Sequence, residues 1–414
     1  MYYPGNWIHS FPQNFQWSNA TLVCKGMAPY GAVALGEIDW IVQKLHQRAN
    51  EPAAWQEEWC AVADKVAAAG DAAAKAGNSA TAGNYYLRAG NYYYTGERMV
   101  PPGAQKTAIY RKALRCFQEG LQRRYPNLEV VDVPYEKKSA LAAYFLKSPV
   151  AKGRAPTVVL FNGLDNCKEM NVLFAGVELA FRGFHTLAID GPGQGESLRL
   201  RNHHARYDYE AAGTPAYEFV AKRKDVDPKR VAIMAYSAGG YYAPRAAAFE
   251  PRYAACVAWG PHYDYHAVWQ ERWAAMKKDY NSVASSNFQL PWVLGTKDME
   301  SAMEKVKKFT LAGVAEKIKC PFLITWGTQD KLTPRSVAET LHAKVGSKDK
   351  TLKIFDEDEG GAEHCQVDNR QVGTDYICDW LEARLGTAAK AKVESRKSEV
   401  KAKKAKTRRR KGKR

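Results

Sequence analysis

The segment from Arg230 to Gly240 constrains the fold of this chain more than any other segment. It reads R-V-A-I-M-A-Y-S-A-G-G, an apolar run that ends at Ser237 with small residues on either side and a helix-like stretch behind it. This spacing predicts a buried strand, a tight turn and a helix, and such a turn presents the serine hydroxyl above the helix N-terminus. Ala235 stands where the usual motif has glycine, a difference of one methyl group. Because short motifs also occur by chance, the assignment needs support from other segments of the chain.

Two later segments carry the groups that a serine nucleophile needs. Residues 321–330 read as a buried strand and a turn with Asp330, and residues 351–364 read as a last strand and a loop that ends on His364. A serine hydroxyl is a weak nucleophile at neutral pH, so it needs an imidazole to accept its proton and a carboxylate to fix the tautomer of that imidazole. The chain order and the strand-end position of the aspartate predict a triad of Ser237, Asp330 and His364.

Each partner of the serine has a simpler explanation when it is considered alone. Asp330 precedes Pro334 and would serve as a helix N-terminal cap, and His364 would be a surface-loop histidine. Glu363 is a second candidate for the acid, but adjacent loop residues rarely point the same way, so we assign it to solvent or to local hydrogen bonds. The joint pattern of order and strand-end placement favours the triad.

An acyl-transfer site also needs hydrogen-bond donors for the oxyanion that develops during the reaction. The apolar strand at residues 158–161 ends in the turn Asn162-Gly-Leu-Asp, and we predict that the backbone N–H groups of Leu164 and Ala238 are these donors. A plain strand-to-loop turn is the alternative. The later turn Gly191-Pro-Gly-Gln-Gly-Glu fits neither the P-loop nor the dinucleotide fingerprint, and we interpret it as scaffold.

The hydrophobic pattern divides the chain into three parts. Residues 54–123 carry apolar and aromatic side chains three and four apart, so we expect an N-terminal helical domain over residues 1–125. Strand patterns begin near Leu128 and predict an α/β domain over residues 126–388, built on a mostly parallel, doubly wound sheet. An aromatic-rich insertion at about 261–318 is the expected lid of this domain. Residues 389–414 are expected to form a disordered polybasic tail.

The net charge of +17 is concentrated in that tail. From Lys390 to Arg414 there are 14 Lys and Arg against two Glu, so +12 lies in the tail and +5 on the rest of the chain. A basic tail can bind nucleic acid or anionic surfaces through phosphate contacts. Nonspecific, salt-sensitive contacts with anionic surfaces are the simpler explanation, and we favour it.

The cysteines and the N-terminal residues indicate the compartment and the absence of bound groups. The eight cysteines lie far apart with no C-x-x-C pair, so neither a disulfide framework nor a zinc site is implied, and we expect no cofactor and no metal. The N-terminus has no basic start followed by an apolar stretch, and no run approaches the length of a membrane span. We therefore expect a soluble, cytoplasmic protein.

Several segments together resemble one branch of the α/β-hydrolases. They are the serine turn, the turns at 162–169, 190–196 and 326–330, the loop at 360–369, and the W-x-x-x-W and tyrosine-rich helices. The branch contains 2,6-dihydroxypseudooxynicotine hydrolase and the fungal polyketide-shortening hydrolases of pigment synthesis, and the resemblance runs from about Trp55 to Leu385. It implies an α/β-hydrolase fold with an N-terminal helical domain and a lid insertion, and it suggests a homodimer. It also implies that Ser237, Asp330 and His364 cleave a carbon–carbon bond beside a ketone.

The same resemblance directs attention to charged residues of the lid. The nicotine-pathway enzyme of this branch adds a lid carboxylate to its triad, and this chain offers Asp264 or Glu271 nearby, with His266 close to the matching place. Cleavage of a ketone requires a proton for a carbon leaving group, and a lid acid would help to deliver it.

These features are compatible with three functions. The first is a cofactor-independent serine hydrolase that splits a carbon–carbon bond in a small β-dicarbonyl-like or vinylogous acid substrate. The second is a carboxylesterase or peptidase-like hydrolase that uses the same triad. The third is a non-catalytic binding protein whose basic tail docks on nucleic acid. An intact triad argues against the third function, whereas a triad and an oxyanion hole serve the first two equally well.

Overall fold

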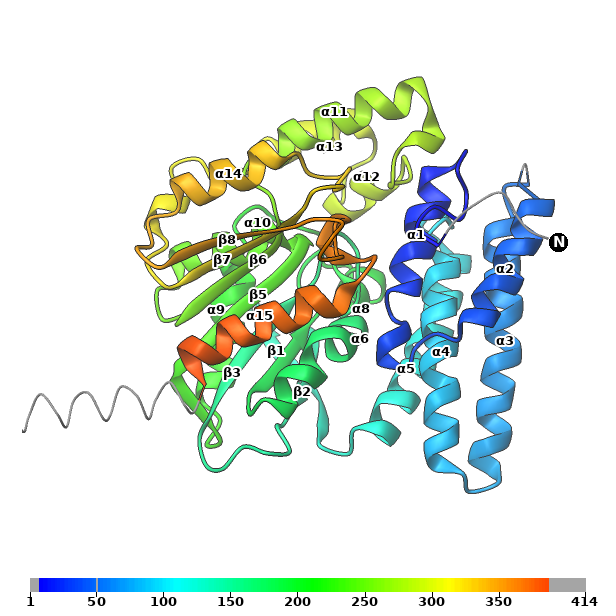
Figure 1. Cartoon of the computed structure of the whole chain (residues 1–414), viewed down its shortest axis with the longest axis horizontal. Helices are drawn as coiled ribbons and strands as arrows, with labels where there is room; N and C mark the ends of the chain where they lie inside the picture. The colour runs from blue at the N-terminus through cyan, green and yellow to red at the C-terminus, as the bar shows by residue number, and fades with distance from the viewer. Residues whose placement is uncertain (1–6, 50, 387–414) are drawn as a thin grey trace, which may run out of the picture.

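The structure is a computed structural model that describes residues 7–49 and 51–386. The tail predicted at residues 389–414 therefore lies outside the described residues. A single sheet forms the centre of the described part (Figure 1). Its strands are β1 (Leu128–Tyr135), β2 (Ser139–Leu146), β3 (Ala155–Phe161), β4 (His185–Ile189), β5 (Val226–Ala238), β6 (Ala255–Pro261), β7 (Phe322–Gly327) and β8 (Lys350–Phe355).

The sheet is mostly parallel, as the sequence predicts. Its strand order is β1-β2-β4-β3-β5-β6-β7-β8; β2 runs antiparallel to both of its neighbours, and every other neighbouring pair is parallel. The central strands β3, β4, β6 and β7 are buried along their whole length, which explains their continuous apolar sequences. The edge strand β8 is largely half-buried and carries lysines.

Helices cover both faces of the sheet. Side chains alternate along β3, so that Val158 and Leu160 enter one hydrophobic core while Val159 and Phe161 enter the other. The helices of the α/β part are α6 (Lys168–Asn171), α7 (Val177–Phe181), α8 (Gly195–Arg199), α9 (Glu210–Ala221), α10 (Gly239–Phe249), α14 (Arg335–Lys344) and α15 (Arg370–Leu385). The cores that result are those of a doubly wound α/β sheet, and the predicted α/β-hydrolase fold class is confirmed.

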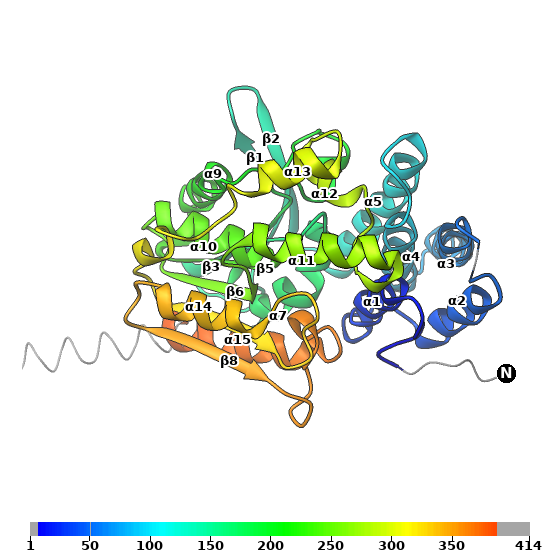
Figure 2. The same cartoon turned by 90° about the horizontal axis from the view of Figure 1, so that it is seen from above.

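In the described part of the chain, five α-helices precede the sheet and stand together at one side of it (Figures 1 and 2). They are α1 (Phe15–Lys25), α2 (Leu35–Gln47), α3 (Ala54–Lys75), α4 (Ser79–Glu97) and α5 (Ala104–Arg124). Helices α4 and α5 can pack closely because glycines lie at their contact. A Cβ at Gly90 would lie 2.8 Å from Phe117, and a Cβ at Gly120 would lie 2.8 Å from Leu87. The residues of this bundle belong to the same hydrophobic core as one face of the sheet.

The segment between β6 and β7 forms the lid. Its helices are α11 (Tyr265–Lys278), α12 (Gln289–Leu294) and α13 (Met299–Val306), and α11 crosses above the strands (Figure 2). The described residues also contain short helical turns between these elements. They are η1 (Ala28–Tyr30), η2 (Val172–Gly176), η3 (Tyr280–Ser282), η4 (Ala315–Lys317) and η5 (His364–Gln366). Among residues 7–49 and 51–386, no helix has the length and apolarity that crossing a bilayer requires.

Candidate active site

Ser237 occupies a strained turn between β5 and α10. Its φ is +57°, a left-handed conformation that a serine adopts only where the surroundings enforce it. The enforcement comes from crowding, since a Cβ at Gly239 would lie 2.5 Å from the Ala235 Cβ and 2.6 Å from the carbonyl oxygen of Asn162. The turn therefore holds the serine at the end of β5, and the extra methyl of Ala235 fits because position 239 has no side chain.

The structure brings Ser237, His364 and Asp330 into one hydrogen-bonded line. The Ser237 Oγ lies 2.8 Å from Nε2 of His364, and Nδ1 of His364 lies 2.7 Å from Oδ2 of Asp330. The other carboxylate oxygen of Asp330 accepts hydrogen bonds from the backbone N–H groups of Leu332 and Thr333, at 2.8 and 2.9 Å. These two bonds fix the carboxylate, so the imidazole is held with Nε2 towards the serine.

The electrostatics of this line suit a proton acceptor. The Asp330 side chain is fully buried, and that of His364 is 10% exposed. Burial opposes the charged imidazolium, but the Asp330 carboxylate outweighs this effect and raises the pKa of His364. The arrangement thus stabilises the imidazolium that forms when the serine loses its proton.

The loop after β3 lies directly against the serine turn. A Cβ at Gly163 would lie 3.0 Å from the Ser237 Cβ, and Leu164 lines the same cavity as Ser237. Ala238 is the N-cap of α10. The two backbone segments that we predict as oxyanion donors are therefore adjacent, and their role stays a prediction.

The glycine-rich turn after β4 supports this loop. The Gln194 amide donates a hydrogen bond to the carbonyl of Asn162 at 2.6 Å, and its oxygen accepts one from the N–H of Gly191 at 2.9 Å. The buried Asp190 carboxylate accepts hydrogen bonds from the Asn162 amide at 2.9 Å and from the N–H of Lys168 at 2.7 Å. The turn is thus hydrogen-bonded to the loop that carries Leu164 and supports it, in line with the scaffold role that we predict for it.

A buried ionic network ties the same loop to the N-terminal helices and to the lid. Glu97 at the end of α4 lies 2.5 Å from both Lys106 and Arg199. Arg199 donates to the backbone carbonyl of Asp165 at 2.8 Å, and Asp165 accepts a hydrogen bond from Gln289 of the lid at 2.7 Å. Since each of these side chains is buried, the network links α4, the lid and the loop beside Ser237 through direct contacts.

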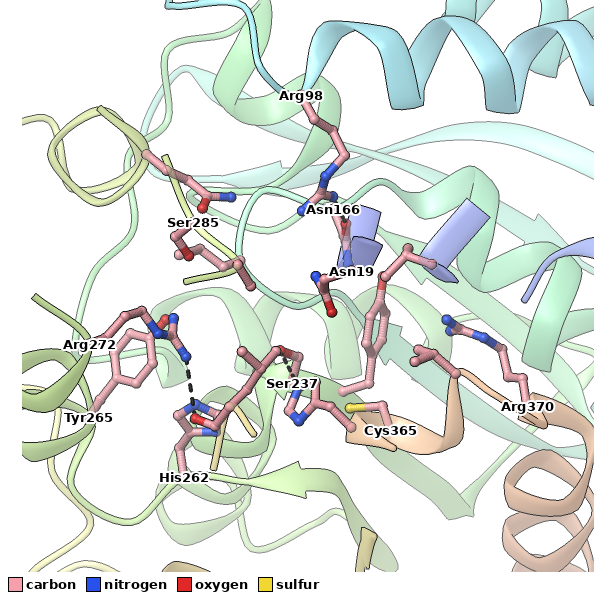
Figure 3. Close-up of a pocket in the computed structure, with 18 residues that line it drawn as sticks. Asn19, Arg98, Asn166, Ser237, His262, Tyr265, Arg272, Ser285, Cys365 and Arg370 are labelled. Carbon is pink, nitrogen blue, oxygen red and sulfur yellow. Dashed lines mark hydrogen bonds between the residues drawn. The ribbon is translucent and has the colours of Figure 1, made fainter. Parts of the chain in front are cut away.

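A cavity opens in front of Ser237, and several distant segments line it (Figure 3). Asn19 comes from helix α1, and Arg98 is the residue that follows α4. The lid contributes His262, Tyr265 and Arg272 among others. The loop after β8 contributes His364, Cys365 and Val367, and the start of α15 contributes Arg370. The cavity therefore exists only where the N-terminal helices, the sheet and the lid meet.

None of the three predicted lid residues lines this cavity. Asp264 is exposed and serves as the N-cap of α11, where its carboxylate accepts a hydrogen bond from the N–H of Ala267 at 3.1 Å. Glu271 is exposed and borders a separate pocket beside Asp330, and His266 is only partly buried. The helical phase explains the difference, because α11 turns the face with Tyr265 and Arg272 towards the serine.

His262, the residue after β6, is one of the lid side chains in the cavity that the sequence analysis did not assign to the site. It is 2% exposed and lies in T-shaped contact with the Tyr265 ring, at 4.9 Å between centroids. Burial, together with the charges of His364 and Arg272, lowers the pKa of His262 to about 3. This imidazole is therefore neutral near physiological pH, and it can exchange hydrogen bonds with a substrate without carrying charge.

Glu363 and Cys365 flank the candidate base and have other contacts. The Glu363 carboxylate lies 3.8 Å from Nε2 of His9, and burial raises the pKa of Glu363 to about 7. The thiol of Cys365 donates to the backbone carbonyl of Trp259 at 3.2 Å. Neither side chain takes the place of Asp330 at Nδ1 of the histidine.

Known proteins that are similar to this chain in sequence are hydrolases. Residues 212–378 match the acetyl xylan esterase (AXE1) family. Hydrolase LUC6 of Fusarium sp is 28% identical over 87% of this chain and 94% of its own length. The 20-hydroxy-prefusarin hydrolase FUS2 of Gibberella moniliformis is 26% identical over 86% of this chain and 94% of its own length.

A bacterial enzyme is similar in both sequence and structure. The 2,6-dihydropseudooxynicotine hydrolase of Paenarthrobacter nicotinovorans is 25% identical over 65% of this chain and 66% of its own length. The crystal structure of a 2,6-dihydroxy-pseudo-oxynicotine hydrolase superposes with a TM-score of 0.73 at 21% identity, covering 88% of this chain and 96% of that chain. The N-terminal helices and the sheet are therefore parts of one shared fold.

Proposed function

We propose that this α/β-hydrolase, a relative of 2,6-dihydropseudooxynicotine hydrolase and of the fungal hydrolases, cleaves a carbon–carbon bond beside a ketone in a small molecule. The observation that carries the proposal is the line from Ser237 through His364 to Asp330, with hydrogen bonds of 2.8 and 2.7 Å. In this proposal Ser237 is the nucleophile and His364 is the base. Asp330 orients the imidazole of His364 and stabilises its protonated form.

The first step is attack on the ketone. The Ser237 Oγ adds to the carbonyl carbon while its proton passes to Nε2 of His364, which lies 2.8 Å away. The carbonyl oxygen becomes an oxyanion, and the backbone N–H groups of Leu164 and Ala238 are proposed to stabilise it. Asp330 stabilises the resulting imidazolium, consistent with the raised pKa of His364.

The second step breaks the carbon–carbon bond. The oxyanion collapses to an ester on Ser237, and the electron pair of the broken bond moves onto the leaving carbon as an enolate of the second carbonyl. The imidazolium of His364 returns a proton to this leaving group. His262 and Arg272 line the same cavity and supply a neutral imidazole and a cation for the enolate oxygen. These two side chains take the part that we predicted for Asp264, His266 or Glu271.

The third step releases the acid product. Water attacks the ester on Ser237 with His364 again as base, and the serine is restored. A substrate of the form R–CO–CH₂–CO–R′ thus takes up one water and yields R–COOH and CH₃–CO–R′. The balance requires no oxidant, reductant or cofactor.

A carboxylesterase is the second candidate, and the match of residues 212–378 to the acetyl xylan esterase family favours it. The same three steps apply, but an alkoxide leaves in place of an enolate. An activated ester needs no help at the leaving group, so His262 and Arg272 would contribute little to its cleavage. This difference separates the two functions experimentally.

A homodimer is also proposed from the resemblance to the branch, with a small molecule as substrate. Light scattering coupled to size exclusion tests this proposal, and a monomeric mass at working concentrations would refute it.

The test of the reaction compares substrates and variants. We expect purified protein to hydrolyse 1-phenyl-1,3-butanedione, and Ser237→Ala to lower kcat on the order of 10³-fold or more. A fluorophosphonate probe should label Ser237 alone. The control Ser282→Ala makes the same chemical change at an exposed lid serine and should retain full turnover. Wild-type turnover in Ser237→Ala would refute the triad.

The choice between diketone and ester rests on His262. We expect His262→Gln to reduce the ratio of diketone to p-nitrophenyl acetate turnover by about 10²-fold, the usual scale of assistance to a leaving group. The control Glu271→Gln lies on α11 outside the cavity and should keep the wild-type ratio. Absence of diketone cleavage in the wild-type protein would favour the carboxylesterase.

A further inference from the structure

Among the described residues, the permanently charged side chains that line the cavity in front of Ser237 are all arginines. Three arginines, Arg98, Arg272 and Arg370, line the cavity, and no aspartate or glutamate does so among the described residues. In the view of Figure 3, Arg272 and Arg370 lie on opposite sides of Ser237, and Arg98 lies beyond Asn166. A substrate in front of the serine therefore meets three guanidinium groups in the cavity wall.

Arg370 is the most informative of the three arginines. It is 2% exposed, and its Nε and Nη1 atoms have no hydrogen-bond partner within residues 7–49 and 51–386. Its guanidinium instead lies over the Phe174 ring, 4.5 Å from the centroid. A buried guanidinium that lacks an anion is costly, because the charge loses its hydration without compensation.

The charge of the Arg272 guanidinium also has few partners. Its one hydrogen bond within the described residues goes to the backbone carbonyl of Leu332 at 3.3 Å, and its guanidinium lies 4.6 Å from the Trp269 ring centroid. Burial lowers the pKa of Arg272, although a guanidinium stays charged at any physiological pH. Arg98 donates to the Asn166 side chain at 3.2 Å and forms no ion pair within 4.0 Å in the described part of the chain.

Elsewhere the fold pairs its buried arginines. The Arg199 side chain is 1% exposed, and it lies 2.5 Å from Glu97 and 3.3 Å from Asp165. Lys106 in the same region also lies 2.5 Å from Glu97. None of the three arginines that face the cavity forms such an ion pair within the described residues, although Asp330 and Asp165 lie near enough to act on the charges of Arg272 and Arg98. A ligand can therefore supply the direct negative partner.

We propose that the cavity selects anionic substrates, and that Arg370, with Arg98 and Arg272, binds a planar, delocalised oxygen anion. The inference rests on the proposed function, because it assigns a substrate class to the same site. A guanidinium presents N–H donors in a fork that matches two oxygens at once. A carboxylate has this geometry, and so does the enolate of a 1,3-dicarbonyl compound. A neutral substrate would leave the guanidinium of Arg370 buried without a partner, so it should be disfavoured.

The first test measures hydrolysis of a matched pair of esters. Mono-p-nitrophenyl glutarate carries a carboxylate at the end of its acyl chain, and p-nitrophenyl pentanoate is a neutral chain of the same length. We expect wild-type kcat/KM to favour the acidic ester by roughly 10²-fold, the scale expected for a buried charge pair. Arg370→Gln should remove most of this preference, and Arg370→Lys should keep part of it.

Controls separate charge recognition from folding. Arg335→Gln removes an exposed arginine on α14 and should keep the wild-type preference. If Arg370→Gln does not fold, Arg272→Gln provides the same comparison from the other side of the serine. Equal kcat/KM of the wild-type protein for both esters, or an unchanged preference in the folded Gln variant, would overturn the proposal.

The second test measures binding without turnover, so that it does not depend on the triad. Calorimetry on Ser237→Ala should detect 5-oxohexanoate and show at least about tenfold weaker binding of its methyl ester, since only the acid pairs with the arginines. Equal affinity for the acid and its ester would refute the anion site even if Ser237 proves essential for hydrolysis. Conversely, a clear preference for the acid would support the anion site even if Ser237→Ala retained activity.

The source of the anion is distinguished with diketones. The 2,2-dimethyl derivative of 1-phenyl-1,3-butanedione cannot form an enolate, whereas the parent compound can. If the arginines recognise an enolate, the parent should bind Ser237→Ala more tightly than the derivative and Arg370→Gln should remove the difference. If they recognise a carboxylate, the two diketones should bind equally and weakly, and only 5-oxohexanoate should bind well.

Discussion

Replacing Asp330 with asparagine should lower kcat/KM by about 10⁴-fold while leaving the fold intact. The structure explains why so small a change would matter. One oxygen of Asp330 accepts hydrogen bonds from the backbone N–H groups of Leu332 and Thr333. In the variant, the amide oxygen of the asparagine must therefore occupy that position. The amide nitrogen would then face Nδ1 of His364, where the carboxylate oxygen lies at 2.7 Å.

An amide nitrogen donates hydrogen bonds, so it would select the tautomer of His364 with the proton on Nε2. That tautomer cannot accept the proton of the Ser237 hydroxyl. A fall of about 10⁴-fold corresponds to about 5.5 kcal/mol of lost transition-state stabilisation. The variant also loses the carboxylate that raises the pKa of His364, so the acidic limb of the pH–rate profile should move to lower pH.

The assay is the rate of p-nitrophenolate release from an activated ester, followed with pH, together with the rate of fluorophosphonate labelling of Ser237. The matched control is Asp298→Asn, the same substitution at the N-cap of α13, where asparagine caps equally well. A variant Asp330→Asn that keeps turnover within about tenfold of the wild type, with an unchanged pH profile, would refute the tautomer argument.

Charges elsewhere in the chain lead to three further expected outcomes. Glu97→Gln leaves Lys106 buried without its carboxylate and Arg199 with Asp165 alone, and should lower the free energy of unfolding by about 3–5 kcal/mol in denaturant titration, whereas a loss within error would contradict the role of the network. Glu363 has a folded-state pKa of about 7, so the folded protein holds a proton that the unfolded chain releases from its ordinary value of 4.5, and stability falls as pH rises through this window. Glu363→Gln should therefore raise the melting temperature at about pH 8 and not at about pH 4, and the reverse order would contradict the assignment. Removing residues 390–414 takes away a net charge of +12 and should weaken retention on heparin at unchanged turnover; loss of turnover would show that the interpretation of the tail is wrong.

Much of the fold was predictable because its signals are local. The run before Ser237 contains the apolar residues of a buried strand. The residues around Ser237 are small, and the structure shows that there is no space for a side chain at Gly239. The same holds for the segments that end at Asp330 and His364, where the buried strand β7 and the half-buried strand β8 each pass into a loop. Since parallel strands bring their carboxyl ends to one edge, these three residues could be expected to meet, and their side chains do lie within hydrogen-bond distance.

The lid shows where local signals end. The choice of Asp264, His266 and Glu271 used residue type and position in the chain, but the face that a helix presents depends on where it begins. Helix α11 starts at Tyr265 with Asp264 as its cap, and this register turns Arg272 towards the serine and Glu271 away from it. Spacing could have grouped Tyr265 with Arg272, but only packing against the sheet selects that face.

The order of strands and helices, the strained serine turn and the residues able to act as base and acid could all be read from the chain, because these features depend on neighbours in sequence. The character of the cavity could not, since it arises from packing. Arg98 follows α4, Arg272 belongs to the lid and Arg370 begins α15, and nothing in their local sequences relates them to one another. They face one space because the N-terminal helices, the lid and the last helix pack around the same edge of the sheet, and the cavity there gathers three arginines that have no ion pair in the described residues.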